Sequence, residues 1–447
     1  MRMDVWLEAQ DAPVGRLERA DDKALTFTYS DSATDAERIS LSLPVRQEPY
    51  SDGACRGYFE NLLFEGTPLN SILDSYKLDR DDTGSLLFHL GADCPGAISI
   101  TPEGIGPGKR PGIFPDEYDQ LSDAALSEII KTLHLYKRLP DESRDPSPLA
   151  GVQGKIALVV REGQYWLPKA KTRAPTSHIL KVSPHDDPML TKYECALLAA
   201  AGASGLRTTV FDACEFKIDH LTINAILVSR FDRNVQPDGI YRIHAEDLCQ
   251  ALGLAPRLKY ERKSESAEHR FSAAAVGSVA RQMSAPGLFL QQFLDETLFN
   301  LLVGNTDNHG KNTSILHRNK SIELAPLYDV VPVFMDRTVT HQLAFDIGAA
   351  QFAEDVTQDN LLQMMAALGY RRPRIDKPVE ARLRSFVTAI TDIGMAQGGK
   401  RLADGLAAQM EVVADALNLA LGVPERDYFQ RAVRDEGLSR TGWDAGS

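Results

Sequence analysis

Residues 304–312 read GNTDNHGKN, and they follow directly on the helix-like run FLQQFLDETLFNLLV at 289–303. Gly304 is a typical helix stop signal, so one interpretation of this stretch is a polar helix C-terminus. The other is a catalytic loop, because an Asp, a His, a Lys and two Asn within 307–312 are costly to desolvate unless each has a partner or a ligand. Other features of the sequence are needed to distinguish the two interpretations.

Bulk properties indicate a globular protein with more than one domain. The 447 residues are enough for two or three domains with sizeable cores. Hydrophobic residues make up 43% and charged residues 25%, which is ordinary for a soluble protein. The stretch MRMDVWLEAQ lacks the apolar centre of a signal peptide, and no apolar run approaches the ~18 residues of a membrane span. We therefore expect a cytoplasmic protein with no membrane partner.

Charge and cysteine usage argue against several kinds of site. Residues 1–105 contain 19 acidic and 9 basic side chains, so most of the net charge of −13 lies there. Phosphate contacts need clustered cations, so nucleic-acid binding by the chain alone is not expected. The acidic part is either a solvated surface or a face for a basic protein partner. The five cysteines form no C-x-x-C pair, which indicates neither a zinc site nor a disulfide framework.

The first third of the chain reads as strands and turns followed by a linker and a helix. One helical patch, GYFENLLFEG, interrupts the strands at 57–66. Repeated Pro and Gly at 102–117 prevent both helix and sheet. An amphipathic helix is expected at 122–139, with Ser122 as its N-cap and Pro140 beyond its end.

More strands follow, and then the pattern becomes helical. KIALVV at 155–160 and QYWLPK at 164–169 form an apparent hairpin, and SHILKV at 177–182 reads as a short strand. A helix at 192–203 and strands around 208–214 and 225–231 complete this part, and from about residue 240 to about residue 422 the pattern is mainly helical. The order predicts an α+β fold of two lobes. We divide the chain into an acidic β-rich part at 1–105, a part with a phosphate loop and a strand lysine at 106–235, and a mainly helical part with the catalytic loop at 236–440.

The spacing of Asp307, Asn312 and Asp329 predicts that they converge. Between the last two lie TSIL, a turn at 319–320 and IELA, a short hairpin whose closure brings Asp329 back beside Asn312. An Asp and an Asn supply the hard oxygen ligands that suit Mg²⁺. Asp307 is then left to accept a proton from an attacking hydroxyl, which is the arrangement found in protein kinases.

A phosphotransferase also needs groups for its nucleotide. Lys181, in SHILKV, is placed like the strand lysine that pairs with phosphates, although any edge strand can end in a lysine. The loop AGVQGK at 150–155 offers N–H donors, but it is not a Walker A loop. The segment Ser229–Phe231 either meets an adenine edge or belongs to an ordinary buried strand. His309 is expected to hydrogen-bond within its loop, because no second histidine stands at helical spacing for a metal.

Taken together, these residues resemble the HipA family of bacterial serine/threonine kinase toxins. The resemblance spans roughly residues 4–420 and implies a two-lobed, protein-kinase-like fold of the HipA type. Its motifs are distributed along the chain: SLSLP, YFENLLFEG and SLLFHLGADCPGAISI in the first part, LAGVQGK, SHILK and SRFDR in the middle, and DLCQALGL, KYE, GNTDNHGKN and LAPLYDVV in the last part.

The resemblance implies roles for individual residues. Asp307 is the catalytic base, Asn312 and Asp329 are the Mg²⁺ ligands, and Lys181 contacts the nucleotide phosphates. Ser147 is the site of autophosphorylation; it stands one residue further out than the family's serine, whose place Pro148 takes. The ATP site is lined by Ala150, Gly151, Val152, Gln153, Gly154, Lys155, Lys181, Ser229, Arg230, Phe231, His309, Gly310, Lys311, Asn312, Tyr328 and Asp329.

The family also implies partners. Its members phosphorylate a protein, glutamyl-tRNA synthetase in the best-known case, and a DNA-binding antitoxin neutralises them. We therefore expect an ATP- and Mg²⁺-dependent kinase that acts as a growth-inhibiting toxin, binds a HipB-like antitoxin and reaches DNA only through it. Two other hypotheses stay open: a catalytically weak corepressor module that binds a DNA-bound antitoxin, and a small-molecule phosphotransferase.

Overall fold

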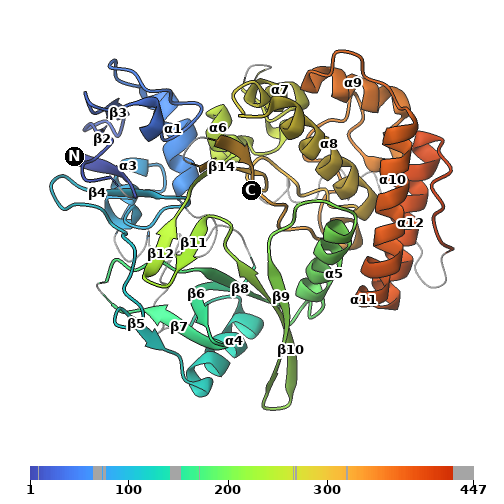
Figure 1. Ribbon diagram of the computed structural model, residues 1–447, viewed down its shortest axis with the longest axis horizontal. Helices are drawn as coiled ribbons and strands as arrows, with labels where there is room; N and C mark the ends of the chain where they lie inside the picture. The colour runs from blue at the N-terminus through green and yellow to red at the C-terminus, as the bar shows by residue number, and fades with distance from the viewer. Residues whose placement is uncertain are drawn as a thin grey trace. The chain divides into compact units, whose positions relative to one another are not determined.

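The computed structural model of the protein consists of two compact units, whose elements are labelled in Figure 1. The first unit comprises Met1–Thr191, Val210–Pro256 and Ile315–Ser321, and the second comprises Lys192–Thr209, Arg257–Ser314 and Ile322–Ser447. The structure describes residues 1–8, 10–63, 73, 77–140, 153–170, 172–264, 266, 269–318 and 321–425. The three-part division at 1–105, 106–235 and 236–440 stays a prediction from the sequence.

A four-stranded antiparallel sheet begins the first unit. Its strands are β1 (Arg2–Leu7), β2 (Gly15–Arg19), β3 (Leu25–Tyr29) and β4 (Ile98–Pro102), in the order β3-β2-β1-β4. The central strand β1 is buried along nearly its whole length. Helices α1 (Asp52–Phe59) and α3 (Thr83–Leu90) share one apolar core with this sheet. The helical patch expected at 57–66 begins in the last three residues of α1 and continues as the single turn η2 (Glu60–Leu62), and its residues 64–66 lie outside the described residues. Helix α3 was not expected.

A six-stranded sheet forms the rest of this unit's framework. Its order is β5-β7-β6-β8-β10-β9, and every neighbouring pair is antiparallel. Helix α4 (Asp123–Tyr136) packs Ile130 and Leu133 into the core of the sheet, and Ser122 caps it as expected by accepting the N–H of Ala125. The strands are β5 (Tyr118–Gln120), β6 (Lys155–Arg161), β7 (Gln164–Pro168), β8 (His178–Val182), β9 (Phe211–Ile218) and β10 (Leu221–Ser229). The expected hairpin is the pair of β6 and β7.

A buried ion pair fixes the later strands of the first unit. Strands β11 (Arg233–Gln236) and β12 (Gly239–Arg242) form a two-stranded sheet that ends at Arg242. The Nε of Arg242 donates to Glu8 Oε2 at 2.6 Å, and neither side chain is more than 3% exposed. A buried ion pair is stable only when the other N–H groups of the arginine also have hydrogen-bond acceptors. Here Nη1 of Arg242 donates to the Ile98 carbonyl and Nη2 to Ser99 Oγ.

Helices dominate the second unit. A helical pattern was expected from about residue 240. Strand β13 (His244–Asp247) and the short helix α6 (Leu248–Leu252) still belong to the first unit, and the longer helices follow them in the second unit. Helix α8 packs against α7, α10 and α12, which lie around it in Figure 1. The helices are α5 (Leu190–Ala203, whose first two residues belong to the first unit), α7 (Ala273–Ala280), α8 (Pro286–Val303), α9 (Gln358–Leu368), α10 (Lys377–Ala389), α11 (Ala396–Gly398) and α12 (Lys400–Leu417).

Short elements complete the chain. Strands β14 (Ser314–Arg318) and β15 (Ser321–Leu324) come after α8, as the sequence predicted. The single-turn helices are η1 (Asp35–Glu37), η2 (Glu60–Leu62), η3 (Pro256–Leu258), η4 (Glu261–Lys263), η5 (Val333–Met335) and η6 (Ala353–Asp355), and a π-helical turn, η7 (Ile390–Met395), continues α10. No helix among the described residues is both long and apolar enough to cross a bilayer.

Helix α8 carries two acidic side chains into the core of the second unit. Every residue from Phe293 to Val303 is buried. Asp295 pairs with Nη2 of Arg382 at 3.1 Å. Burial is the main cause of a rise in the pKa of Glu296 to about 8; Arg207 opposes the rise in part, and the nearby Asp295 adds to it. Glu296 is therefore mostly protonated in the folded protein at neutral pH.

We expect Glu296→Gln to remove part of the pH dependence of stability. The raised pKa means that the stabilising contribution of Glu296 is fully present below its ordinary value of 4.5 and is lost as the pH rises through about 8. Glutamine resembles the protonated acid, so the variant should gain about 3 kcal/mol over wild type between pH 5 and pH 8. Urea unfolding at both pH values measures this, with Glu18→Gln as control because the Glu18 side chain is 46% exposed. An equal difference at both pH values would contradict the shift.

Candidate active site

The polar loop begins where α8 ends. Gly304 adopts a left-handed conformation (φ 64°, ψ 32°), and its N–H donates to the carbonyls of Asn300 and Leu301. A β-carbon at this position would lie 2.4 Å from Cδ1 of Phe334. Both the backbone conformation and the space therefore require glycine. The first interpretation of this stretch, a helix C-terminus, is correct, but it does not account for the contacts made by residues 305–312.

Asn305 connects the loop to its surroundings through all its side-chain polar atoms. It is 4% exposed, and its Nδ2 donates to Asn300 Oδ1 at 2.9 Å and to the carbonyl of Asp329 at 3.4 Å. Its Oδ1 accepts the N–H of Asp307 at 3.3 Å. One buried amide thus fixes the backbone at two of the predicted site residues. The sequence analysis gave Asn305 no role.

Asp307 has a polar neighbour on each side. The hydroxyl of Tyr260 donates to its Oδ1, and Nδ2 of Asn312 donates to its backbone carbonyl at 2.8 Å. Burial raises the pKa of Asp307, and the Asp329 carboxylate raises it further, while the hydrogen bond from Tyr260 acts in the opposite direction. Asp329 thus acts on Asp307 as a like charge.

The hairpin brings Asp329 back to the loop. The N–H of Ala325 donates to the Ser314 carbonyl at 2.8 Å, which closes the hairpin at its base. The Tyr328 hydroxyl then donates to the carbonyl of Lys311 at 3.0 Å and contacts Ser314 Oγ at 2.8 Å. Asp329 itself has φ of 58°, a left-handed conformation that few non-glycine residues adopt, with Asp among those that adopt it most readily. These contacts place the segment that carries Asp329 beside the loop; the convergence of the three side chains and their roles stay predictions.

His309 and Gly310 anchor the loop from the other side. His309 is 6% exposed, and burial lowers its pKa to about 3, so its ring is neutral. The ring packs edge-on against Tyr260, with centroids 5.0 Å apart. The N–H of Gly310 donates to the carbonyl of Lys259 at 3.0 Å. The described contacts of His309 are those of a packed loop residue.

The donor set suits Mg²⁺. Because Nδ2 of Asn312 is engaged by Asp307, its Oδ1 is the atom that remains for a cation, and Asp329 supplies a carboxylate. No group of three or more His, Cys, Asp or Glu among the described residues is arranged to hold a metal by itself. Mg²⁺ commonly binds one or two protein carboxylates and completes its shell with water and phosphate oxygens. A cation here would also reduce the repulsion between Asp307 and Asp329.

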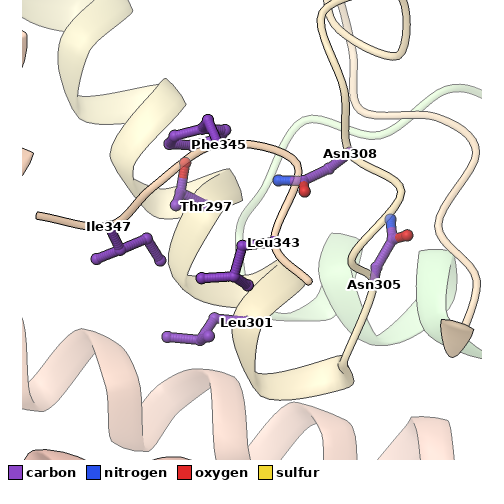
Figure 2. A pocket seen from close by; sticks show the side chains of 7 residues that line it. All are labelled: Thr297, Leu301, Asn305, Asn308, Leu343, Phe345 and Ile347. Carbon is purple, nitrogen blue, oxygen red and sulfur yellow. The ribbon is translucent and has the colours of Figure 1, made fainter. Parts of the chain in front are cut away.

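A pocket opens on one side of the loop, as Figure 2 shows. It has about 220 Å³ of empty space including its open mouth, less than the ~300–1,000 Å³ of typical ligand pockets. It is therefore too small to be the nucleotide site. Its lining comes from α8, the loop and a later segment: Thr297, Leu301, Asn305, Asn308, Leu343, Phe345 and Ile347.

The predicted nucleotide-binding lysines lie in the six-stranded sheet. Lys181 is on β8, an interior strand, so the alternative of an edge-strand lysine is wrong. Its antiparallel partner on β6 is Lys155, and both are half-buried. Residues directly opposed in antiparallel strands point to the same face, so the two lysines lie on one face of the sheet.

The other predicted nucleotide contacts are only partly visible. The N–H groups of Ser229 and Arg230 already donate to backbone carbonyls, and the Arg230 guanidinium is buried against Asp232 at 2.9 Å. Of the phosphate loop, the structure describes Gln153, Gly154 and Lys155. Ser147, Ala150, Gly151 and Val152 lie outside the described residues.

Family models cover most of the chain. The HipA-like C-terminal domain matches residues 147–392, which is more than half of the chain, and the HipA N-terminal domain matches residues 3–101. The protein belongs to the HipA family. The predicted α+β fold of the HipA type is thereby confirmed.

Individual relatives of the HipA family are similar to the chain over most of its length. The chain is 29% identical over 400 residues to Y4mE of Sinorhizobium fredii, covering 88% of this chain and 91% of that protein. It is 28% identical over 347 residues to the serine/threonine-protein kinase toxin HipA of Shewanella oneidensis, covering 75% and 76%. A solved structure of Shewanella oneidensis HipA with HipB and operator DNA matches the fold with a TM-score of 0.74 at 23% identity, covering 93% of this chain and 98% of that one.

We expect Gly304→Ala to destabilise this HipA chain by about 2 kcal/mol or more, because alanine is strained at this φ and its methyl group meets Phe334. Urea unfolding measures the effect. Gly287→Ala is the matched control: it changes a glycine of the same helix where a β-carbon meets nothing within 4 Å, so it should be neutral or stabilising. Equal stabilities of the two variants would show that Gly304 does not constrain the loop.

Proposed function

We propose that the protein is an ATP- and Mg²⁺-dependent serine/threonine kinase that acts as the toxin of a toxin–antitoxin pair. The observation that carries the proposal is the pair of contacts that hold the loop: Asn312 donates to the Asp307 carbonyl, and Asn305 joins the backbone of Asp307 to that of Asp329. Relatives named as kinases support it.

Asp307 would accept the proton of the attacking serine or threonine hydroxyl. A carboxylate with a raised pKa is a better base than an exposed aspartate. Asn312 and Asp329 would hold Mg²⁺, which neutralises charge on the phosphates when bound. Asn305 would keep both segments in place, since its amide contacts the backbone of Asp307 and of Asp329.

The paired lysines would hold the nucleotide phosphates. Lys155 and Lys181 face one another across two antiparallel strands. Two ammonium groups on one face of the sheet would both contact a polyphosphate placed against them. Gln153 and Gly154, which precede Lys155, would add backbone donors, as the sequence suggested.

The family also points to partners. The HipA relative of Shewanella oneidensis was solved with HipB and operator DNA, and we infer that this chain binds a HipB-like antitoxin and reaches DNA through it. Its protein substrate would be an aminoacyl-tRNA synthetase of the glutamyl type. Ser147 would be its own phosphorylation site.

Asp307→Asn tests the kinase activity. The amide cannot accept the proton of the hydroxyl, so phosphoryl transfer should fall about 100-fold or more, while folding and binding of a HipB-like antitoxin persist. Expression of the wild type should stop growth, and expression of the variant should not. Phosphoproteomics of the two cultures would identify the substrate and show whether Ser147 is modified.

The surface variant Asp219→Asn is the control, since this exposed carboxylate pairs only with the surface side chain of Lys131 among the described residues. It should remain toxic. Growth arrest that persists undiminished in Asp307→Asn would reject the kinase toxin and favour a corepressor that binds antitoxin. Phosphate found on small molecules and on no protein would favour a small-molecule phosphotransferase.

A further inference from the structure

The segment 259–262 contacts the catalytic loop at several points, although it lies about 47 residues earlier in the chain. The carbonyl of Lys259 accepts the N–H of Gly310 at 3.0 Å, and the Tyr260 hydroxyl donates to Oδ1 of Asp307. Nothing in the function proposed above uses Tyr260. Its hydroxyl nevertheless contacts the carboxylate on which that function depends.

The ring of Tyr260 is held between two neighbours. The imidazole of His309 packs at 83° to it with centroids 5.0 Å apart, and the guanidinium carbon of Arg262 lies 3.8 Å from its centroid. Edge-to-face and cation–π contacts of this kind favour one ring orientation. The hydroxyl therefore has a fixed position from which to donate.

The backbone on the other side of the tyrosine is also fixed. The N–H of Glu261 donates to the Ala344 carbonyl at 2.8 Å, and Oε2 of Glu261 accepts the N–H of Asp346 at 2.8 Å. Moving Tyr260 away from Asp307 would break these contacts as well as those of the ring. The tyrosine is thus part of a rigid support that joins the loop to residues 344–346.

We propose that Tyr260 is the positioning residue of the catalytic base: its hydroxyl holds Oδ1 of Asp307, which directs Oδ2 toward the acceptor hydroxyl. This inference rests on the proposed kinase function. An aspartate held only at its backbone can rotate about χ1 and χ2, and a displacement of about 1 Å at a reacting group can cost about 100-fold in rate.

Tyr260→Phe tests the proposal, because it keeps the ring between His309 and Arg262 and removes only the hydroxyl. The turnover of Mg·ATP, measured as release or transfer of the γ-phosphate by the full chain, should show a kcat about 10-fold to 100-fold lower. The KM for ATP and the calorimetric affinity for Mg·ATP should stay within about twofold, and the melting temperature should change little, because phenylalanine fills the same space.

Tyr241→Phe is the matched control. Tyr241 also donates its hydroxyl to an aspartate, Oδ2 of Asp238 at 2.9 Å, but on the exposed β11–β12 hairpin. This variant should keep the wild-type kcat. The pair of variants separates loss of a tyrosine–aspartate hydrogen bond in general from loss of the one at Asp307.

Three results would overturn the inference while leaving the kinase intact. The first is an unchanged kcat in Tyr260→Phe. The second is an increased kcat in that variant, which would mean that Tyr260 competes with the acceptor. The third is phosphate found on Tyr260 of the wild type by mass spectrometry. A parallel fall in kcat and in affinity for Mg·ATP would also reject it, since that pattern indicates general disruption. A wild type that transfers no phosphate rejects the proposed function itself and, with it, this inference.

Discussion

The left-handed turn at Gly304 is the constraint on which the candidate site depends. Helix α8 is buried over its last eleven residues, so the direction in which the chain leaves it is set by packing. The turn places Asn305 where its amide contacts the helix end, the backbone of Asp307 and the carbonyl of Asp329. The polar loop thereby acquires one conformation, and two segments separated by a hairpin acquire a fixed spacing. The rate of a reaction at such a site depends on how accurately the reacting groups are positioned.

The electrostatics of the loop are unfavourable in the absence of a ligand. Burial disfavours ionised Asp307, and the nearby Asp329 adds like-charge repulsion. Asp329 also holds a left-handed backbone conformation without being glycine. A cation bound beside these carboxylates would reduce the repulsion between them.

The sequence predicted the local parts of this arrangement and missed the distant ones. The helix, its glycine stop and the hairpin that returns Asp329 are encoded by neighbours in the chain, so spacing and turn signals were sufficient. Tyr260 reaches Asp307 across 47 positions, and only tertiary folding brings them together. Its one signal in the sequence was the KYE motif, which supported the resemblance to the HipA family but did not predict a contact with Asp307. Helix α3 was missed because its short apolar stretch is as compatible with a strand as with a helix.

The most direct measurement is a crystal structure of the protein with Mg²⁺ and a non-hydrolysable ATP analogue. The account predicts a metal about 2.0–2.1 Å from Asn312 Oδ1 and from a carboxylate oxygen of Asp329, with nucleotide phosphates completing its shell. Asp307 should bind no metal and should keep its hydrogen bond to Tyr260. A nucleotide bound away from this loop, or a metal that ignores both Asn312 and Asp329, would contradict the central claim.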